Sequence, residues 1–154
     1  LGCIMVELLL GVPLFPGNDS GHLLALMIGR LGMPPDQLLD GGAQTTVYFD
    51  KAESQPNGHG VGLGTSKYVL KQEYQDLLAQ EENGTKSLMD YIFDHLKSKN
   101  RIDVLRHPKF PGFMSLVTDM LKWIPEDRTA PNLLLKLSVF DLECTPVVTE
   151  PRVP

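Results

Sequence analysis

Glycine residues crowd one short stretch of the chain, in which Gly58, Gly60, Gly62 and Gly64 alternate with other residues. Closely spaced glycines let backbone amides approach an anion such as a phosphate group. The spacing here matches neither G-x-G-x-x-G nor G-x-x-x-x-G-K-[ST], and no strand pattern comes before it. We therefore predict a loop at residues 58–64 and assign no cofactor-binding residue.

Histidine and cysteine side chains could bind a metal ion or act in nucleophilic catalysis if the sequence placed them close together. The chain has neither a C-x-x-C nor an H-E-x-x-H pair. The scattered residues of these types are His22, His59, His95, His107, Cys3 and Cys144. We predict no metal site and no catalytic residue, and we expect both thiols to be reduced, with Cys3 buried.

Two charged residues are notable because apolar sequence lies beside them. Glu7 lies within the run LGCIMVELLL, where a carboxylate must pair with a cation or reach water. It could form a structural ion pair, or it could bind a basic side chain of a peptide substrate. Arg128, in the segment PEDRTA, precedes another apolar stretch. We expect it to pair with a carboxylate in a structural role.

The elements that would position these residues are mostly helices. Residues 1–10 are apolar on nearly every helical face, which predicts a helix buried on all sides that ends at Gly11. After a proline-containing loop, Asp19 or Ser20 can cap a second helix, which a glycine and two prolines end after Leu31. The apolar residues at helical spacing in this second helix are Leu23, Leu24, Met27, Ile28 and Leu31.

The middle of the chain has weaker patterns. From residue 36 to about residue 85 we expect loops with little regular structure, apart from a short helix at residues 37–39. No convincing strand alternation appears there or elsewhere in the chain. The glycine-rich stretch falls within this region.

The last third of the chain returns to helical patterns. A helix can begin at Thr85 or Ser87, another covers residues 113–123, and a last one begins with Thr129 as its cap and Pro131 in its first turn. The expected apolar faces contain Leu88, Ile92, Phe93 and Leu96, then Leu116, Val117, Met120 and Leu121, then Leu133, Leu134 and Leu137. The predicted fold class is mainly α, with long loops.

The composition of the chain limits the classes of partner that it is expected to bind. The chain has 154 residues, 42% of them hydrophobic, which is enough for one core. Its net charge of −5 and its pI near 5.3 argue against binding to nucleic acid or to an anionic membrane surface. The longest apolar run is interrupted at Glu7 and ends at Gly11, far short of the ~20 residues that cross a bilayer. We expect no nucleic-acid or membrane partner and a cytoplasmic or nuclear location.

Four segments, in order, resemble the second half of the large lobe of eukaryotic protein kinases. LGCIMVELL is similar to SLGCI-x-x-E-[LM] in the central buried helix of that lobe, and GVPLFPG to the G-x-P-L-F-x-G loop after it. LGMPP is similar to the LG-x-PP ending of the next helix. The segment from Met120 to Ala130 is similar to ML-x-x-x-P-x-x-R-x-[TS]-A. Together the matches reach from Leu1 to about Phe140.

The long stretch between Pro35 and Phe110 makes the chain similar to the CMGC group of kinases, which carry an insert there. The resemblance implies an incomplete large lobe over residues 1–140, with the insert at about residues 36–106 and an extended tail at residues 141–154. Within the group, the first 51 residues are most similar to the dual-specificity tyrosine-regulated (DYRK) branch and its splicing-associated relatives.

The resemblance implies a parent enzyme that transfers phosphate from ATP, with Mg²⁺, to serine or threonine residues of protein substrates, with dual specificity as a further option. The glycine-rich loop, the H-R-D motif and the D-F-G motif that do this chemistry are absent from the chain. In such kinases they lie N-terminal to the helix that begins here at Leu1, which is not methionine. We expect that upstream sequence is missing, that the fragment alone is inactive, and that no catalytic, ATP-binding or metal-binding residue can be carried over.

Two residues match positions with known roles in the family. By resemblance, Glu7 matches an acidic position that in some kinases contacts an arginine preceding the phosphorylated residue. Arg128 matches the arginine that pairs with the glutamate of the A-P-E motif, which the chain lacks. Removing one partner of a buried ion pair costs roughly 3–5 kcal/mol, so the resemblance implies that the isolated chain is poorly stable.

Two alternatives stay open at this point. The protein could be a non-catalytic pseudokinase or binding module whose insert docks a partner, and upstream sequence without the H-R-D and D-F-G aspartates would favour it. The chain could also be a truncated gene product with no function of its own, which a start inside a helix favours.

Overall fold

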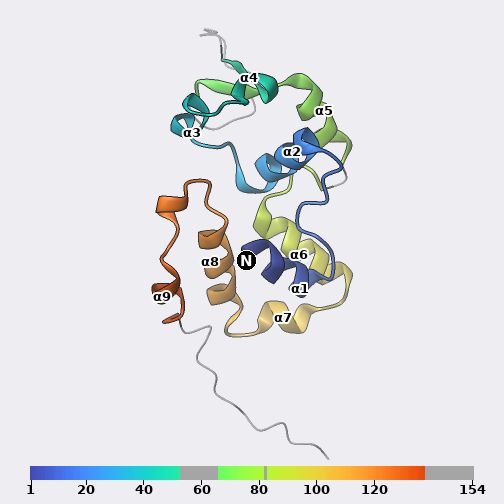
Figure 1. Cartoon of the computed structure of the whole chain (residues 1–154). Helices are drawn as coiled ribbons and strands as arrows, with labels where there is room; N and C mark the ends of the chain where they lie inside the picture. Colours follow the sequence, from blue (N-terminus) through green and yellow to red (C-terminus); the bar gives the residue numbers. More distant parts are fainter. Residues whose placement is uncertain (53–65, 82, 138–154) are drawn as a thin grey trace, which may run out of the picture.

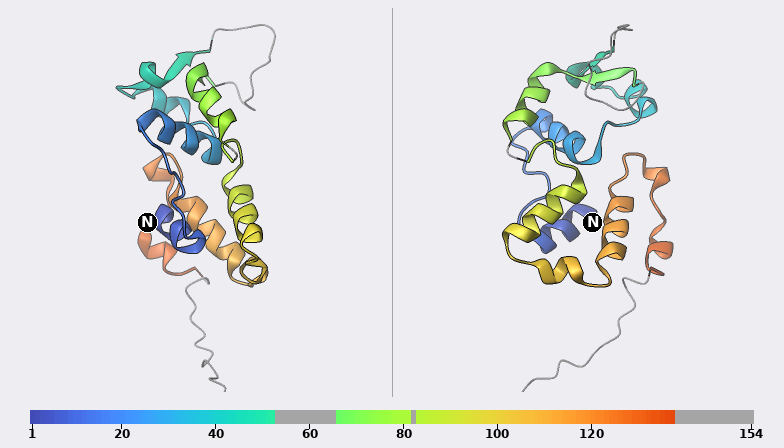
Figure 2. Two further views of the ribbon diagram at one scale, coloured as in Figure 1. Left: turned by 90° about the vertical axis from the view of Figure 1, so that its right-hand side faces the viewer. Right: turned by 180° about the vertical axis from the view of Figure 1, so that it is seen from behind.

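The computed structural model describes residues 1–52, 66–81 and 83–137, and its elements form two bodies (Figure 1 and Figure 2). The upper body contains α2 (Ser20–Leu31), α3 (Asp36–Asp40), α4 (Thr45–Tyr48), β1 (Phe49–Lys51), β2 (Tyr68–Leu70) and α5 (Gln72–Gln80). The lower body contains α1 (Gly2–Leu10), α6 (Leu88–Ser98), α7 (Ile102–Arg106), α8 (Phe110–Met120), the 3-10 turn η1 (Pro125–Asp127) and α9 (Pro131–Leu134). The described residues are therefore mainly helical, as predicted.

Local sequence explains where the best-predicted helices begin and end. Asp19 caps α2, because its Oδ1 accepts a hydrogen bond from the backbone N–H of His22 at 2.8 Å. Ser87 caps α6 in the same way, accepting from the backbone N–H of Asp90 at 3.2 Å. Gly11 ends α1 with a φ of 76°, a left-handed value that favours glycine. These boundaries confirm the sequence predictions.

The lower body has its core where α1 packs against α6 and α8. The side chains at its centre, each at most 1% exposed, are Val6, Ile92, Leu96 and Val117. Stacked rings of Phe93, Phe110 and Phe113 extend this core along α6 and α8. Burial of each aliphatic side chain at the centre of this core stabilises the fold by about 1.5–3 kcal/mol.

The upper body has a separate core, in which α2 packs against α5 and the two strands pair antiparallel. Phe49 and Leu70 face each other in the register and are both buried. The expectation of loops between residues 36 and 85 is therefore wrong for β1, β2, α4 and α5, although the short helix predicted at residues 37–39 is confirmed as α3. The glycine-rich residues 58–64 lie outside the described residues.

The buried face of α2 differs from the predicted one. The buried residues are Gly21, His22, Ala25, Leu26 and Arg30, whereas Leu23 is 39% exposed. The ring of Tyr74 from α5 leaves no room for a Cβ at Gly21, so the glycine side of α2 is where the two helices meet. Of the predicted apolar face, Leu24 and Ile28 are partly buried against the upper core, and the fully buried side of the helix lies next to them.

Helix α1 is less buried than the sequence predicted. Only Gly2, Val6 and Leu10 are buried, and Cys3, predicted to be buried, is exposed. The opposite side of the helix carries Leu1, Ile4 and Leu8, which are 79%, 56% and 81% exposed. We call these three residues the α1 apolar stripe. A helix predicted to be buried on all sides is covered on one side only in this chain.

Two helix boundaries in the last third also differ. α8 begins at Phe110, three residues before the predicted start at Phe113, and α7 was not predicted. Thr129 does not cap α9, and of its three expected core leucines only Leu134 is buried. The tail predicted at residues 141–154 lies outside the described residues. Among the residues that the structure describes, no helix has the length and apolar character needed to span a membrane.

Candidate functional site

Glu7 lies on the exposed part of α1, beside the α1 apolar stripe. Within the described part of the chain, its carboxylate has no ion pair or side-chain hydrogen bond. The structural ion pair considered from the sequence is therefore not formed with any described residue, and the exposed carboxylate reaches water. A carboxylate at the edge of an apolar surface is suited to accept hydrogen bonds from a basic side chain.

Arg128 belongs to a second group of polar residues, at the turn that links α8 to α9. Its Nε donates to the carbonyl oxygen of Lys122 at 2.9 Å, and the side chain is exposed. The expected carboxylate partner is not among the described contacts of Arg128. Since an exposed guanidinium is hydrated, the penalty of an unpaired buried charge does not arise at Arg128.

The carboxylate that does hold this turn is Asp119, which sequence reasoning missed. It accepts from the backbone N–H of Thr129 at 2.7 Å through Oδ2 and pairs with the ammonium group of Lys122 through Oδ1. Lys122 also donates to the carbonyl oxygen of Asp127 at 2.8 Å. The hydrogen bonds from Lys122 and then Thr129 lower the pKa of Asp119 from its ordinary value of 3.8 to about 2.

Acid should therefore loosen the α8–α9 turn. Because the folded-state pKa of Asp119 is depressed, its contribution to stability is complete above about pH 4 and is lost as the pH falls towards 2. We expect the denaturation midpoint of the chain to drop between pH 4 and 2, and the drop to be smaller in the Asp119→Asn variant. Urea titrations at several pH values would measure it, and identical pH curves for the two proteins would contradict it.

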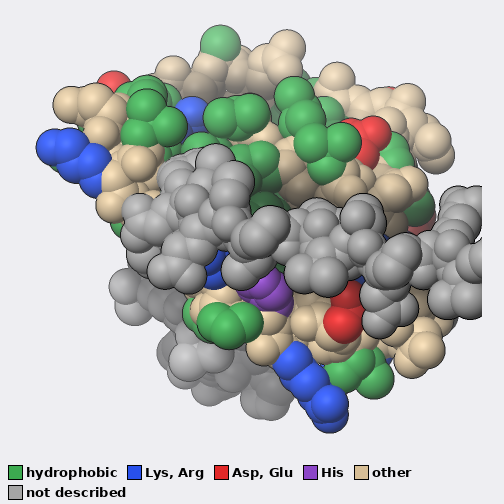
Figure 3. All heavy atoms as spheres, turned by 90° about the horizontal axis from the view of Figure 1, so that it is seen from below, with side chains coloured by type: hydrophobic (Ala, Val, Ile, Leu, Met, Phe, Trp, Pro, Cys, Tyr) green, Lys and Arg blue, Asp and Glu red, His purple; other side chains and the backbone are tan. Residues whose placement is uncertain are grey.

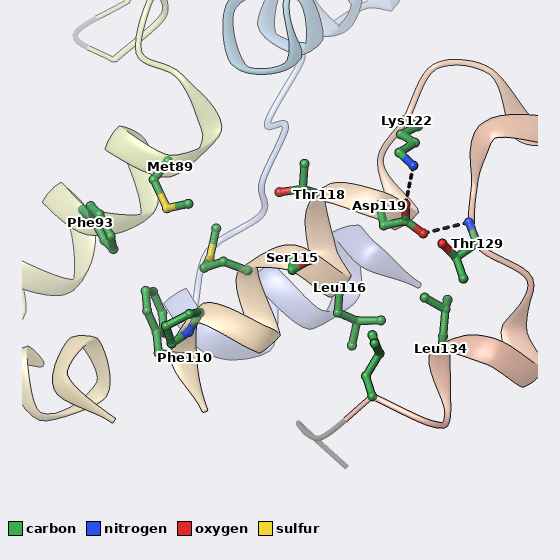
Figure 4. A pocket seen from close by; sticks show the side chains of 13 residues that line it. Met89, Phe93, Phe110, Ser115, Leu116, Thr118, Asp119, Lys122, Thr129 and Leu134 are labelled. Atoms are coloured by element: carbon green, nitrogen blue, oxygen red, sulfur yellow. Dashed lines mark hydrogen bonds and ion pairs between the residues drawn. The ribbon is translucent and has the colours of Figure 1, made fainter. Parts of the chain in front are cut away.

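A groove of about 590 Å³ runs over α8 beside this turn (Figure 4). Met89 and Phe93 of α6 form one wall, and Leu134 of α9 lies on the opposite wall. The floor is α8, which presents Ser115 and Thr118, and the Asp119–Lys122 pair closes one end. The groove is apolar along its walls and charged only at this end, where both charges already have partners.

No group of three His, Cys, Asp or Glu side chains among the described residues could hold a metal ion. Glu7 and Arg128 lie on different elements, and the described contacts do not join them. On the face seen from below, basic and acidic side chains are interspersed with hydrophobic ones over the described part of the surface (Figure 3).

Two further residues escaped the sequence analysis. Arg30 is buried near the end of α2, with its guanidinium 4.2 Å from the ring centre of Tyr91. Trp123 donates from Nε1 to the carbonyl oxygen of Gly32 at 3.1 Å. The only signals in the sequence were an arginine inside an apolar helix and the single tryptophan of the chain.

Three characterised proteins that are similar to the chain are all protein kinases. No protein-family model matches the chain. It is 32% identical over 136 residues to the probable serine/threonine-protein kinase dyrk2 of Dictyostelium discoideum, a match that covers 88% of this chain and 12% of that protein. It is 45% identical over 69 residues to the dual specificity tyrosine-phosphorylation-regulated kinase 3 of Mus musculus, covering 45% of this chain and 12% of that protein. It is 33% identical over 145 residues to the mitogen-activated protein kinase hog1 of Blastobotrys adeninivorans, covering 90% of this chain and 34% of that protein.

Proposed function

This chain is a relative of the protein kinases of the CMGC group, kinases of the DYRK type among them, and on that premise we propose that it is a C-terminal part of the large lobe of a protein kinase. The complete protein would use ATP and Mg²⁺ to phosphorylate serine or threonine, with or without tyrosine, on protein substrates in the cytoplasm or nucleus. The chain spans only 12% of the length of its first DYRK-type relatives, so activity, substrates and location are proposed for a longer protein.

The observation that carries this proposal is the α1 apolar stripe. Leu1, Ile4 and Leu8 are each more than half exposed in a helix that resembles the central buried helix of the kinase lobe. Exposed apolar area of this kind marks a surface that another segment covers. We propose that the remainder of the kinase domain packs on the stripe, with the lobe over residues 1–140 and the insert at about 36–106.

The test compares the complete protein with the isolated chain. With ATP, Mg²⁺ and a protein substrate, the complete protein should transfer phosphate, and the chain of residues 1–154 should transfer none. Because its α1 stripe is uncovered, the isolated chain should also aggregate, or melt over a broader range of temperature than the complete protein. A complete protein that binds no ATP would contradict the kinase proposal, and an isolated chain that stays monomeric and melts as sharply as the complete protein would contradict the proposal that the stripe is normally covered.

A non-catalytic kinase-like module is the second candidate. The observation that favours it is the presence of exposed apolar residues on three elements of the upper body, within the proposed insert. They are Leu38, Val47 and Val69. Such residues could dock a protein partner whether or not the complete protein is active. A complete protein that captures a partner but neither binds ATP nor transfers phosphate would favour this candidate.

Within the kinase proposal, Glu7 is a substrate-binding residue that selects arginine before the phosphorylated residue, and Arg128 has a structural role. In the complete kinase, Glu7→Ala should reduce the preference for an arginine-containing peptide over its alanine counterpart by about tenfold or more, since a hydrogen bond to a charged group contributes about 1.5–3 kcal/mol. The ratio of kcat/KM for the two peptides measures it, and the KM for ATP should not change.

The matched control for Glu7 is Glu126→Ala, which removes an exposed carboxylate from η1. This variant should keep the arginine preference of the unaltered kinase. If Glu7→Ala kept it as well, the substrate-binding role of Glu7 would be refuted while the kinase assignment would stand.

A further inference from the structure

A cleft of about 490 Å³ lies where the end of α2 meets the start of α6 and the end of α8. Leu31 and Pro35 line it from the upper body, and Leu88, Met89 and Leu121 line it from the lower body. A cavity of this size can hold a small organic molecule, and a mostly apolar lining with a few polar groups is typical of such sites.

Contacts between the two bodies hold the walls of the cleft in place. Leu31 of α2 packs against the core of the lower body, and α2 also contacts α6. Trp123, which lines the cleft, donates from Nε1 to the carbonyl oxygen of Gly32 at 3.1 Å. The cleft is therefore already formed, and a ligand would not have to rearrange its walls.

Arg30 brings a buried positive charge to the lining of this cleft. The residue is 6% exposed, and its Nε and Nη1 have no hydrogen-bond partner among the described residues. Its guanidinium lies 4.2 Å from the ring centre of Tyr91 and 5.6 Å from that of Phe15, and these rings attract a cation without replacing an oxygen acceptor. Burial lowers the pKa of the guanidinium, yet an arginine stays charged at neutral pH. Since a buried cation without an acceptor is costly, Arg30 favours the binding of an anion.

The other charged residues that line the cleft are Lys122 and Asp127. The ammonium group of Lys122 pairs with Asp119 and donates to the carbonyl oxygen of Asp127 at 2.8 Å. The side chain of Asp127 is exposed, so water and salt screen its repulsion of an anion. Of the charged side chains in the lining, Arg30 is thus the one whose hydrogen-bond donors are left unused in the described part of the chain.

We propose that this cleft binds a small organic acid, whose carboxylate pairs with the guanidinium of Arg30 and whose hydrocarbon body contacts the apolar walls. A carboxylate matches the forked N–H groups of a guanidinium, and hydrogen bonds between charged groups are stronger than neutral ones. Each methylene group that leaves water for the apolar walls adds to the affinity. The site does not depend on the kinase assignment.

The test is a fluorescence titration of the 154-residue chain in dilute solution. Trp123 is the single tryptophan of the chain and lines the cleft, so its emission reports on binding there. The probe is octanoate, compared with octanol, which lacks the charge, and with inorganic phosphate, which lacks the apolar body. We expect a saturable change with a Kd for octanoate at least about tenfold lower than that for octanol, and weaker binding of phosphate. Equal affinity for octanoate and octanol, tighter binding of phosphate, or no response to millimolar octanoate would overturn the proposal.

Substitutions of Arg30 separate the role of its charge from that of the cleft shape. Arg30→Met should remove the preference for octanoate over octanol, because methionine keeps an apolar side chain of similar length without the charge. Arg30→Lys should keep part of the preference, since the charge remains but the planar fork is lost. The matched control is Arg106→Met, which removes an exposed arginine of α7 and should keep the full preference. A preference that survives in Arg30→Met would refute the site.

Amide hydrogen exchange in the complete protein gives a second measurement that does not depend on the solubility of the isolated chain. Octanoate should slow exchange in residues 28–32 and 118–123, which border the cleft, more than octanol does. Arg30→Met should abolish this difference. Exchange in both segments that responds equally to octanoate and octanol would contradict the pairing with Arg30.

Discussion

Replacing Ile92 by alanine is expected to lower the free energy of unfolding of the lower body by about 2–5 kcal/mol. Ile92 is completely buried on α6, in the core that this helix forms with α1 and α8. Removing three carbons there loses their burial and leaves a cavity that the surrounding helices cannot close. A domain of this size has only about 5–15 kcal/mol of stability, so the loss is a large part of the total.

The matched control is Ile92→Val, which removes one carbon and should cost about 0.5–1.5 kcal/mol. Amide hydrogen exchange in α6 measures both, with about a tenfold faster exchange for each 1.4 kcal/mol. An alanine variant that exchanges no faster than the valine variant would mean that α6 does not depend on this core. It would also undermine the packing of α1 on which the kinase proposal rests.

The helices that could be predicted from sequence are those whose signals are local. Asp19 and Ser87 cap the helices that follow them because an oxygen on a short side chain reaches backbone N–H groups three residues ahead. Gly11 ends α1 because its own backbone adopts a left-handed conformation. None of these interactions needs a partner from a distant part of the chain, so the sequence alone contains them.

The structure of the upper body could not be predicted from the sequence, because it depends on contacts between segments that lie far apart in the chain. Each strand has three residues, too few for an alternating pattern to be recognised, and Phe49 meets Leu70 only after the intervening residues have been spanned. Helix α5 buries a single residue, Leu78, so its sequence has no apolar face of the expected width. Its position follows from the close approach of Tyr74 to Gly21 of α2.

The burial of α1 and the partners of the charged residues could not be predicted from the sequence either. Hydrophobic residues on every face of α1 predicted burial on all sides, yet exposure depends on which segments are present to cover the helix. Arg128 was expected to find a carboxylate but donates to a backbone carbonyl, while Asp119, which no motif marked, organises the same turn. In both cases residue type restricted the options and tertiary contacts selected among them.

Gly29→Ala should produce the opposite effect from the one that helix propensity predicts. A helix with alanine at an interior position is normally more stable than the same helix with glycine there, by about 0.8–1.0 kcal/mol. At Gly29, however, a Cβ would overlap the carbonyl oxygen of Gly84, a backbone atom that cannot rotate away, and would press against Leu78. Overpacking of this kind costs typically about 1–3 kcal/mol and occasionally more, and we expect a net loss of stability of about 2 kcal/mol in the upper body.

Gly41→Ala is the matched control, because the glycine that follows α3 has room for a side chain. Its φ of −92° suits any residue, and the nearest atom to an added Cβ is 3.9 Å away. This variant should be neutral or more stable by about 0.4–1 kcal/mol, because alanine has fewer conformations to lose on folding. Amide exchange in α2 and α5 would measure both variants. A stabilised Gly29→Ala variant would mean that α2 and the backbone of Gly84 are not in close contact, which would contradict the packing of the upper body.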